Sequence, residues 1–185
     1  EASHLGFDSN FTIYDATDSR SLVKSIIKEM GLDEKTYKPA TVAGRISMAK
    51  NNLILPDAYA KDPSLFRYDN ESRMPAIRDI YQVYYDRCHT SNAMDFDDLL
   101  LFTYILFSRF PEILKKYSDR FHFILVDEYQ DTNYAQHSIV IMLTKTNQNV
   151  CVVGDDAQSI YSFRGAKIDN ILNFRKAYTD AKTFK

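Results

Sequence analysis

Apolar residues in the first part of the chain recur every three to four positions, the spacing of helices with one buried face. The clearest case predicts a helix over residues 18–30, capped by Asp18 or Ser19 and followed by Gly31. Residues 56–74 are rich in Pro, Asp and Asn, which predicts a loop with short turns. The same helical spacing predicts further helices over residues 39–52, from Pro75 onward, over 95–107 and over 111–117.

The pattern changes after residue 120, where short apolar runs alternate with helical segments. Residues 121–126 and 150–153 are continuous apolar runs that lead into acidic residues, which predicts two buried strands. Helices are predicted over 135–144 and 169–178, and residues 181–185 resemble the start of a further strand. Because strands alternate with helices, we expect the α/β class, with a parallel sheet and helical crossovers.

Three segments follow from these patterns. Residues 1–15 include a short extended run at 11–14, residues 16–93 are predicted to be helical, and residues 94–185 alternate between helix and strand. We therefore expect an entry segment, a helical subdomain and part of an α/β core. The chain begins at Glu1 without Met, and we expect it to be a piece of a longer protein.

The composition adds limits on function. Of 185 residues, 45% are apolar and 26% charged, with a net charge of -2, so any nucleic-acid site must be a local feature. Cys88 and Cys151 are too few for a disulfide framework or a cysteine zinc site, which favours a reducing, cytoplasmic setting. Since no apolar run has the length of a membrane span, we expect no membrane partner.

The first candidate chemistry lies at the end of the run FILVDE, residues 123–128, where Asp127 and Glu128 follow the apolar residues. Open parallel sheets bind ligands beyond the carboxyl ends of their strands. An apolar strand followed by Asp-Glu is typical of a Walker B site, where the Asp holds Mg²⁺ against nucleotide phosphates and the Glu polarises the attacking water. On this stretch alone, a strand that ends in solvated acid fits equally well.

A second acidic strand end strengthens the nucleotide hypothesis. The run VCVVGDD, residues 150–156, brings another Asp to the same predicted edge, and Gln158 follows with an amide that suits a phosphate sensor or an ordinary polar turn. Tyr161, Phe163 and Arg164 come next, and aromatic faces beside a guanidinium suit single-stranded bases and phosphates. Core packing of the two aromatic side chains is an equal alternative for that stretch.

Four stretches together resemble a known family. DEYQDTN at 127–133 and VVGDDAQSIYSFRGA at 152–166 resemble motifs II and III of superfamily 1 DNA helicases of the UvrD/Rep/PcrA group. MDFDDLL at 94–100 and FTIYDATDSRSLVKSIIKE at 11–29 resemble the borders of that group's helical insertion. The resemblance covers nearly the whole chain, but only a middle slice of the longer family protein. It implies a partial RecA-like P-loop NTPase sheet (1–15 and 94–185) with an inserted all-helical subdomain (16–93).

The resemblance also implies roles and partners. Asp127 would bind the Mg²⁺ of Mg-ATP, Glu128 would be the catalytic base, and Gln158 would contact the γ-phosphate. Gln130 and Asp131 would support the site through hydrogen bonds. The parent would couple ATP hydrolysis to movement on single-stranded DNA and unwinding at single-strand/duplex junctions. The single-stranded DNA path would be lined by Tyr161, Phe163 and Arg164, with Phe163 where many relatives carry Trp.

A phosphate-binding loop of the form G-x-x-x-x-G-K-[ST] does not occur in the chain. We therefore expect that loop upstream and a second motor domain downstream, and we predict that the chain alone neither hydrolyses ATP nor unwinds DNA. Two other hypotheses remain open. One is a DNA- or protein-interaction module on a degenerate ATPase core, and the other is a two-metal nuclease that uses Asp127, Glu128, Asp131 and Asp155.

Weaker signals have plain structural explanations. Asp95, Asp97 and Asp98 are predicted to cap a helix and offset its dipole rather than to bind a metal. Packing is predicted for Tyr81, Tyr84 and Tyr85. Either a duplex-facing surface or a solvated mixed-charge face would suit the basic side chains Lys35, Lys38, Arg45, Lys50, Lys61, Arg67 and Arg73.

Overall fold

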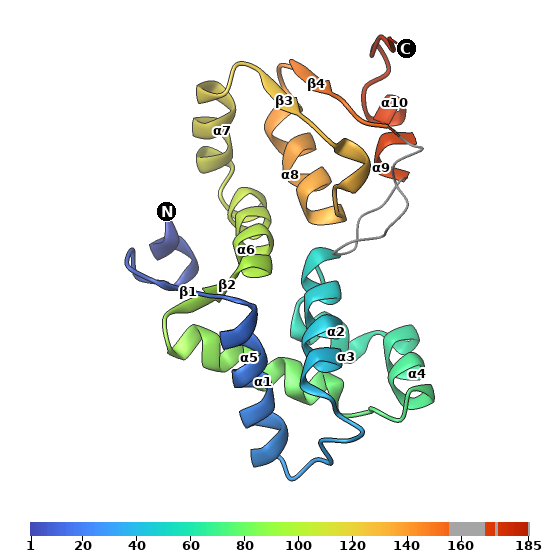
Figure 1. Ribbon diagram of the computed structural model, residues 1–185. Coiled ribbons are helices and arrows are strands. Elements are labelled where there is room, and N and C mark those ends of the chain that lie inside the picture. The colour runs from blue at the N-terminus through green and yellow to red at the C-terminus, as the bar shows by residue number, and fades with distance from the viewer. Residues whose placement is uncertain (156–168, 173, 185) are drawn as a thin grey trace. The chain divides into compact units, whose positions relative to one another are not determined.

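The computed structural model describes residues 1–155, 169–172 and 174–184. The chain forms two compact units, Glu1–Phe102 and Thr103–Lys185, and each contains a two-stranded parallel sheet together with helices (Figure 1). The predicted α/β class is therefore confirmed, with helix as the main element. Within the part of the chain that is described, no helix has the length and apolar character required to cross a membrane.

The first unit holds most of the helices. Strands β1 and β2 pair in parallel, with Thr12 opposite Ala93 and Tyr14 opposite Asp95. Strand β2 was not predicted, because three residues are too few to show a period and their partner strand lies far away in the sequence. The elements are η1 (Ala2–Leu5), β1 (Thr12–Tyr14), α1 (Ala16–Glu29), α2 (Pro39–Asn51), α3 (Pro56–Lys61), α4 (Pro63–Glu71), α5 (Ile77–Thr90), β2 (Ala93–Asp95) and α6 (Phe96–Arg109), which continues into the second unit.

Two corrections concern helix starts in this unit. The loop predicted over residues 56–74 is wrong, because α3 and α4 occupy most of it, and each begins with a proline at its first position, where the missing N–H costs nothing. Asp62 caps α4 by accepting from Ser64 N at 2.7 Å. The predicted cap of α1 is also wrong: Asp15 is the N-cap and accepts from Asp18 N at 2.8 Å.

The core of the first unit lies among α1, α2 and α5. Val23, Ile26 and Ile27 from α1 are fully buried, as the helical spacing predicted. Tyr81 and Tyr84 of α5 are 0% and 1% exposed, which confirms the prediction that these rings pack inside the protein. Large aromatic side chains of this kind bury much apolar surface, so α5 is the central helix of this core.

The second unit carries the strands that end in acid. Strands β3 and β4 pair in parallel, with Ile124 opposite Val150 and Val126 opposite Val152, and α8 connects them. This confirms the predicted parallel pair with a helical crossover. The elements after α6 are α7 (Pro111–Arg120), β3 (Ile124–Val126), η2 (Tyr129–Asp131), α8 (Tyr134–Thr144), β4 (Val150–Val152), α9 (Asp169–Leu172) and α10 (Phe174–Ala177). Residues 181–184 form no strand.

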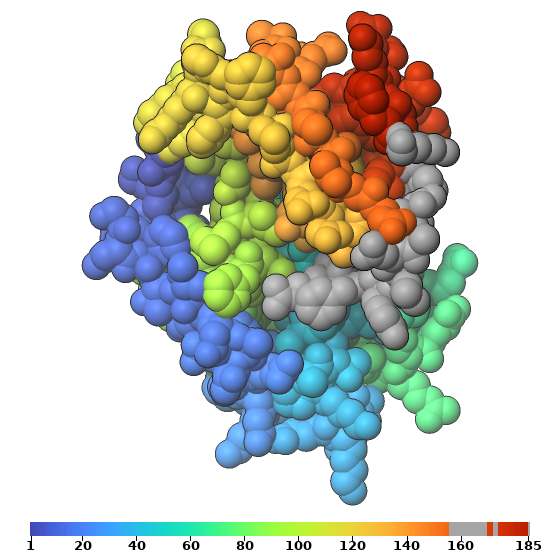
Figure 2. All heavy atoms as spheres, turned by 45° about the horizontal axis from the view of Figure 1, so that its top comes forward, coloured from blue at the N-terminus to red at the C-terminus, as the bar shows by residue number. Residues whose placement is uncertain are grey.

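One face of the β3–β4 sheet lies open to solvent, although the sequence predicted buried strands. Phe123, Leu125 and Val153 are 73%, 77% and 60% exposed, whereas Ile124 and Val126 on the other face are partly buried. Successive side chains of a strand point to opposite faces, so one face is covered and the other is bare. Figure 2 shows the yellow-to-orange segments that carry β3 and β4 side by side at the surface.

Candidate active site

The carboxyl ends of β3 and β4 bring the predicted acidic residues to one edge of the sheet. Asp127 and Glu128 directly follow β3, and Asp155 follows β4 after a short extension. Val153 N donates to Val126 O at 2.8 Å, which continues the pairing up to the acids. All three acidic residues, Asp127, Glu128 and Asp155, are exposed. The edge is therefore acidic and open, as a site for a hydrated cation and phosphates requires.

Glu128 leaves the strand in an unusual backbone conformation. Its φ of 48° and ψ of 43° lie in the left-handed region, which costs a residue other than glycine about 1 kcal/mol or more. The conformation is held on both sides: Glu128 N donates to Asp127 Oδ1 at 2.9 Å, and Asp131 N donates to Glu128 O at 2.9 Å. This sharp turn carries the Glu128 side chain out of the line of the strand.

Gln130 lies buried beneath this edge and links the two acidic strand ends. Its Nε2 donates to Glu128 Oε2 at 2.6 Å, and its Oε1 accepts from Asp155 N at 3.1 Å. The side chain is only 1% exposed. A backbone N–H is always a donor and an ionised carboxylate always an acceptor, so only this orientation of the amide satisfies both partners.

Gly154 leaves the space that Gln130 occupies. A Cβ at this position would lie 2.5 Å from Gln130 Oε1 and 2.7 Å from Ile171 Cδ1. Gly154→Ala is therefore expected to lower the free energy of unfolding by about 1–3 kcal/mol, because the buried amide must move. Gly44→Ala, inside α2, is the matched control: no atom of the described residues lies within 4 Å of its would-be Cβ, so a gain of about 0.5–1 kcal/mol is expected.

Urea unfolding followed by circular dichroism compares the two glycine variants with the unmodified chain. Gly154→Ala should unfold at lower urea concentration and Gly44→Ala at higher. Equal midpoints for Gly154→Ala and the unmodified chain would show that the amide of Gln130 does not lie against the end of β4.

Tyr129 and Asn170, which the sequence does not identify as site residues, hold the turn after β3 in place through hydrogen bonds. Tyr129 is fully buried, and its hydroxyl contacts His137 Nδ1 at 2.6 Å. Burial lowers the pKa of His137, which favours the neutral imidazole that accepts from this hydroxyl. Asn170 Nδ2 donates to Thr132 O at 2.9 Å and so ties α9 to the same turn.

Other predicted residues lie outside the part of the chain that the structure describes. They are Gln158, Tyr161, Phe163 and Arg164, and their assignments to the γ-phosphate and to single-stranded DNA stay predictions. Asp127, Glu128, Gln130 and Asp155 are the predicted residues that the structure brings together at one edge.

Comparisons with known proteins identify the family of the chain. Residues 1–179 match the family described as UvrD/REP helicase N-terminal domain. The chain belongs to this family. It is 43% identical to the ATP-dependent DNA helicase PcrA of Staphylococcus epidermidis over 183 residues, 99% of the chain, and it is equally similar to the PcrA helicase of Staphylococcus aureus. The chain spans 24% of the length of these relatives.

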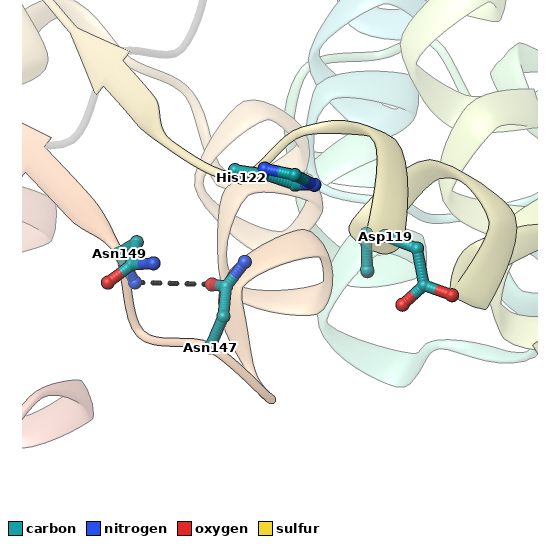
Figure 3. A pocket seen from close by; sticks show the side chains of 5 residues that line it. Asp119, His122, Asn147 and Asn149 are labelled. Atoms are coloured by element: carbon teal, nitrogen blue, oxygen red, sulfur yellow. Dashed lines mark hydrogen bonds between the residues drawn. The ribbon is translucent and has the colours of Figure 1, made fainter.

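The pocket drawn in Figure 3 lies at the other end of the strands of this UvrD/REP domain. His122 precedes β3 and Asn149 precedes β4, so the pocket lies at the amino ends of the two strands, where Asn149 N donates to Asn147 Oδ1 at 3.1 Å. Parallel sheets bind ligands at the opposite, carboxyl ends. The lining residues are Ser118, Asp119, His122, Asn147 and Asn149.

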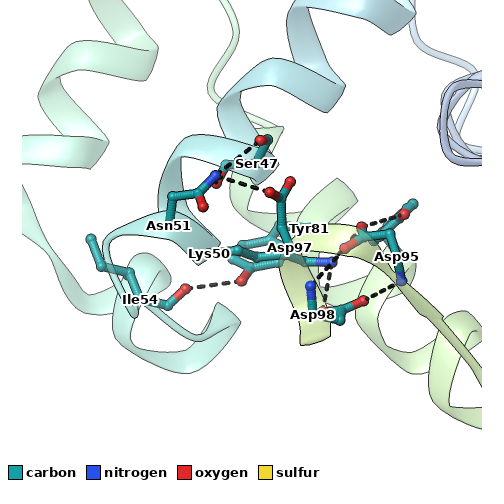
Figure 4. A network of polar contacts seen from close by, with 9 residues as sticks. Ser47, Lys50, Asn51, Ile54, Tyr81, Asp95, Asp97 and Asp98 are labelled. Atoms are coloured by element: carbon teal, nitrogen blue, oxygen red, sulfur yellow. Dashed lines mark hydrogen bonds and ion pairs between the residues drawn. The ribbon is translucent and has the colours of Figure 1, made fainter. Parts of the chain in front are cut away.

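A second acidic group of the UvrD/REP domain, at the start of α6, surrounds a lysine (Figure 4). Lys50 Nζ lies 2.7 Å from Asp95 Oδ2 and 2.7 Å from Asp98 Oδ1, and Lys50 is 1% exposed. Tyr84 donates its hydroxyl to Asp95 Oδ2 at 2.8 Å. Lys50 therefore belongs to the interior, so a DNA-facing or solvated position for this residue is wrong.

At the start of α6, the carboxylates of Asp95 and Asp98 also accept hydrogen bonds from each other's backbone N–H groups. Asp98 N donates to Asp95 Oδ1 at 2.8 Å, and Asp95 N donates to Asp98 Oδ2 at 3.1 Å, as in a capping box. This confirms the predicted capping role for Asp95 and Asp98, whereas Asp97 Oδ1 accepts from Asn51 Nδ2 at 3.0 Å. Among the described residues, no group of three or more His, Cys, Asp or Glu side chains is placed to hold a metal ion.

Although both carboxyl groups are buried beside the ammonium group of Lys50, Asp95 and Asp98 have different pKa values. Burial, together with the charge of Asp95, raises the pKa of Asp98 to about 6, although Lys50 opposes the shift. Burial also acts to raise the pKa of Asp95, but the charge and hydrogen bond of Lys50 hold it below its usual value. Lys50 lies against both carboxylates, but Asp95 Oδ2 also accepts from the Tyr84 hydroxyl at 2.8 Å, whereas the charge of Asp95 raises the pKa of Asp98, so Asp98 is the more easily protonated.

Proposed function

We propose that this chain contributes half of the ATP site of a longer ATP-dependent DNA helicase. The observation that carries the proposal is the edge where Asp127 and Glu128, after β3, meet Asp155, after the paired strand β4, in a chain of the UvrD/REP family. The relatives named ATP-dependent DNA helicase PcrA support the ATP and DNA assignments. In this proposal the two sheets belong to a RecA-like core, and the helices of residues 16–93 form a subdomain inserted into it.

The donor set at this edge fits Mg²⁺. Carboxylate oxygens are the ligands that Mg²⁺ prefers, and one or two of them suffice when phosphates and water complete the shell. Asp127 would hold the ion, and the exposed Glu128 carboxylate would take the proton of the attacking water. Bound Mg²⁺ would neutralise charge on the phosphates of ATP. Gln158 would contact the γ-phosphate in the same arrangement.

Single-stranded DNA would lie along the residues that follow the acidic edge. Tyr161, Phe163 and Arg164 combine two aromatic faces with a guanidinium, a set that stacks on bases and binds the backbone without reading sequence. They come within ten residues of Asp155, so a change at the phosphates has a short path to the DNA. The longer protein would use this coupling to move along single strands and to unwind single-strand/duplex junctions.

The chain alone is expected to lack ATPase and helicase activity. No G-x-x-x-x-G-K-[ST] run occurs in its 185 residues, so the lysine and backbone amides that cradle the phosphates must come from elsewhere. ATPase and helicase activity are therefore expected only of the longer protein.

Steady-state ATP hydrolysis by the longer protein, with and without single-stranded DNA, tests this function. Strong stimulation by DNA is expected, while the 185-residue chain shows no turnover. A folded longer protein that binds DNA without stimulated turnover would instead indicate an interaction module on a degenerate ATPase core. Metal-dependent DNA cleavage without ATP would instead indicate the nuclease.

A further inference from the structure

We propose that Gln130 is a positioning residue that holds the Glu128 carboxylate and ties it to the end of β4. The inference rests on the proposed ATPase function and adds a mechanical link within that site. Gln130 is 1% exposed, and the two ends of its amide bond in opposite directions, one to Glu128 and one to the backbone of Asp155. One buried side chain thus spans both acidic strand ends.

The two contacts of Gln130 require an amide side chain of this length. The Nε2 group donates to a carboxylate at 2.6 Å while Oε1 accepts from a backbone N–H at 3.1 Å, so the residue must be donor and acceptor at once. A carboxylate at this position would keep the acceptor but direct a second negative oxygen at Glu128. A shorter amide would not reach both partners.

Packing makes this link stiff. The backbone at Gly154 passes so close to Gln130 Oε1 that a Cβ on Gly154 would lie 2.5 Å from this oxygen. Tyr129 N also donates to Val153 O at 2.9 Å, so the residues on either side of the link are fixed to each other. A shift of the β4 end therefore moves the amide, and the amide moves the Glu128 carboxylate.

The consequence is a path from the end of β4 to the proposed base. Gln158, the predicted γ-phosphate contact, follows Asp155 by three residues in the sequence. A displacement of the Asp155 backbone would reach Glu128 through Gln130. A base that is displaced by about 1 Å loses on the order of 10²-fold in rate. Gln130 would thus make turnover depend on the position of β4.

Two substitutions in the longer protein test this link. Gln130→Ala and Gln130→Glu are each expected to lower kcat about 10²-fold while the KM for ATP stays within about threefold, because a positioning contact acts on the base and not on binding. Gln130→Glu is nearly isosteric and guards against a folding failure of Gln130→Ala.

The pH profile separates positioning from a general structural effect. The kcat of Gln130→Glu, relative to the unmodified protein, should recover as pH falls toward 6, because only the protonated form of the introduced carboxyl group can donate to Glu128. Circular dichroism at each pH shows that the variant stays folded. Gln136→Glu is the matched control. Gln136 is exposed, and among the described residues its side chain caps α8 by accepting from Asn133 N, a hydrogen bond that a carboxylate can also accept. Its kcat and pH profile should not change.

The outcomes separate this inference from the proposed function. Normal kcat and pH profile in both Gln130 variants, with a DNA-stimulated unmodified protein, would overturn the link and leave the function standing. If the unmodified protein shows no turnover, the function fails, and amide NMR of the 185-residue chain decides the link. Gln130→Ala should then speed hydrogen exchange at Asp155 N–H, and Glu128→Ala should shift the side-chain amide signals of Gln130. No change in either would overturn it.

Discussion

Replacing Glu128 by Gln in the longer protein is expected to reduce DNA-stimulated ATP turnover by about 10²–10⁴-fold, the range that general-base catalysis contributes. An amide cannot take a proton from the attacking water. Its carbonyl oxygen can still accept from Gln130 Nε2, which lies 2.6 Å from the present carboxylate, so the turn after β3 should keep its shape. Because the Asp127 carboxylate is kept, the KM for ATP should be nearly unchanged.

Steady-state kinetics with saturating single-stranded DNA measures this loss, and an exposed glutamate provides its control. Glu112 is exposed in the first turn of α7 and does not belong to the acidic edge, so Glu112→Gln should leave kcat unchanged. A Glu128→Gln variant that retains kcat within about threefold would mean that another group accepts the proton, since loss of a true base costs far more.

The acidic edge could be predicted because it depends on local signals and one general rule. Apolar runs identify β3 and β4, acids follow each run, and parallel strands joined by a helix bring their carboxyl ends together. The structure pairs the two strands with Val126 opposite Val152, so Asp127 and Asp155 reach one edge. Helical spacing identified α1 and its buried residues for the same local reason.

Contacts between distant residues could not be predicted. Lys50 and Asp95 are both charged, and each alone suggests the surface, yet together they are buried at 2.7 Å. The hydrogen bond from Asp155 N to Gln130 Oε1 likewise joins residues that follow two different strands, and α8 separates these strands in the sequence. The open face of β3 was missed because an apolar run shows what a strand can bury, whereas exposure depends on which elements pack against it.

Signals with two meanings caused the remaining errors. Pro56 and Pro63 are typical of turns, but proline also suits the first position of a helix, and both open short helices in the structure. By residue type Asp15 and Asp18 both suit the cap of α1, and the two form one capping box in which Asp15 is the N-cap. In each case the deciding factor is the backbone direction before the helix, which residue types alone do not reveal.

Replacing Lys50 by Met is expected to lower the free energy of unfolding of the chain by about 3–5 kcal/mol, because removing one partner leaves buried charge unpaired. Asp95 and Asp98 are 8% and 2% exposed, so water cannot replace the lost ammonium. Methionine fills a similar volume, which confines the change to charge and hydrogen bonding. Urea unfolding followed by circular dichroism measures the loss, and Lys24→Met on the exposed side of α1 is the control, expected within about 0.5 kcal/mol of the unmodified chain.

The loss of stability in Lys50→Met should also depend on pH, and the direction of that dependence identifies the buried ion pair as its cause. Without Lys50, both carboxyl groups keep their burial and lose the positive charge that favoured ionisation, so each should have a pKa above its unfolded value. A raised folded-state pKa contributes stability at low pH that is lost as pH rises through it. Lys50→Met should therefore be closer in stability to the unmodified chain at pH 5 than at pH 8. An equal loss at both pH values would point to packing of the lysine stem rather than to the buried ion pair.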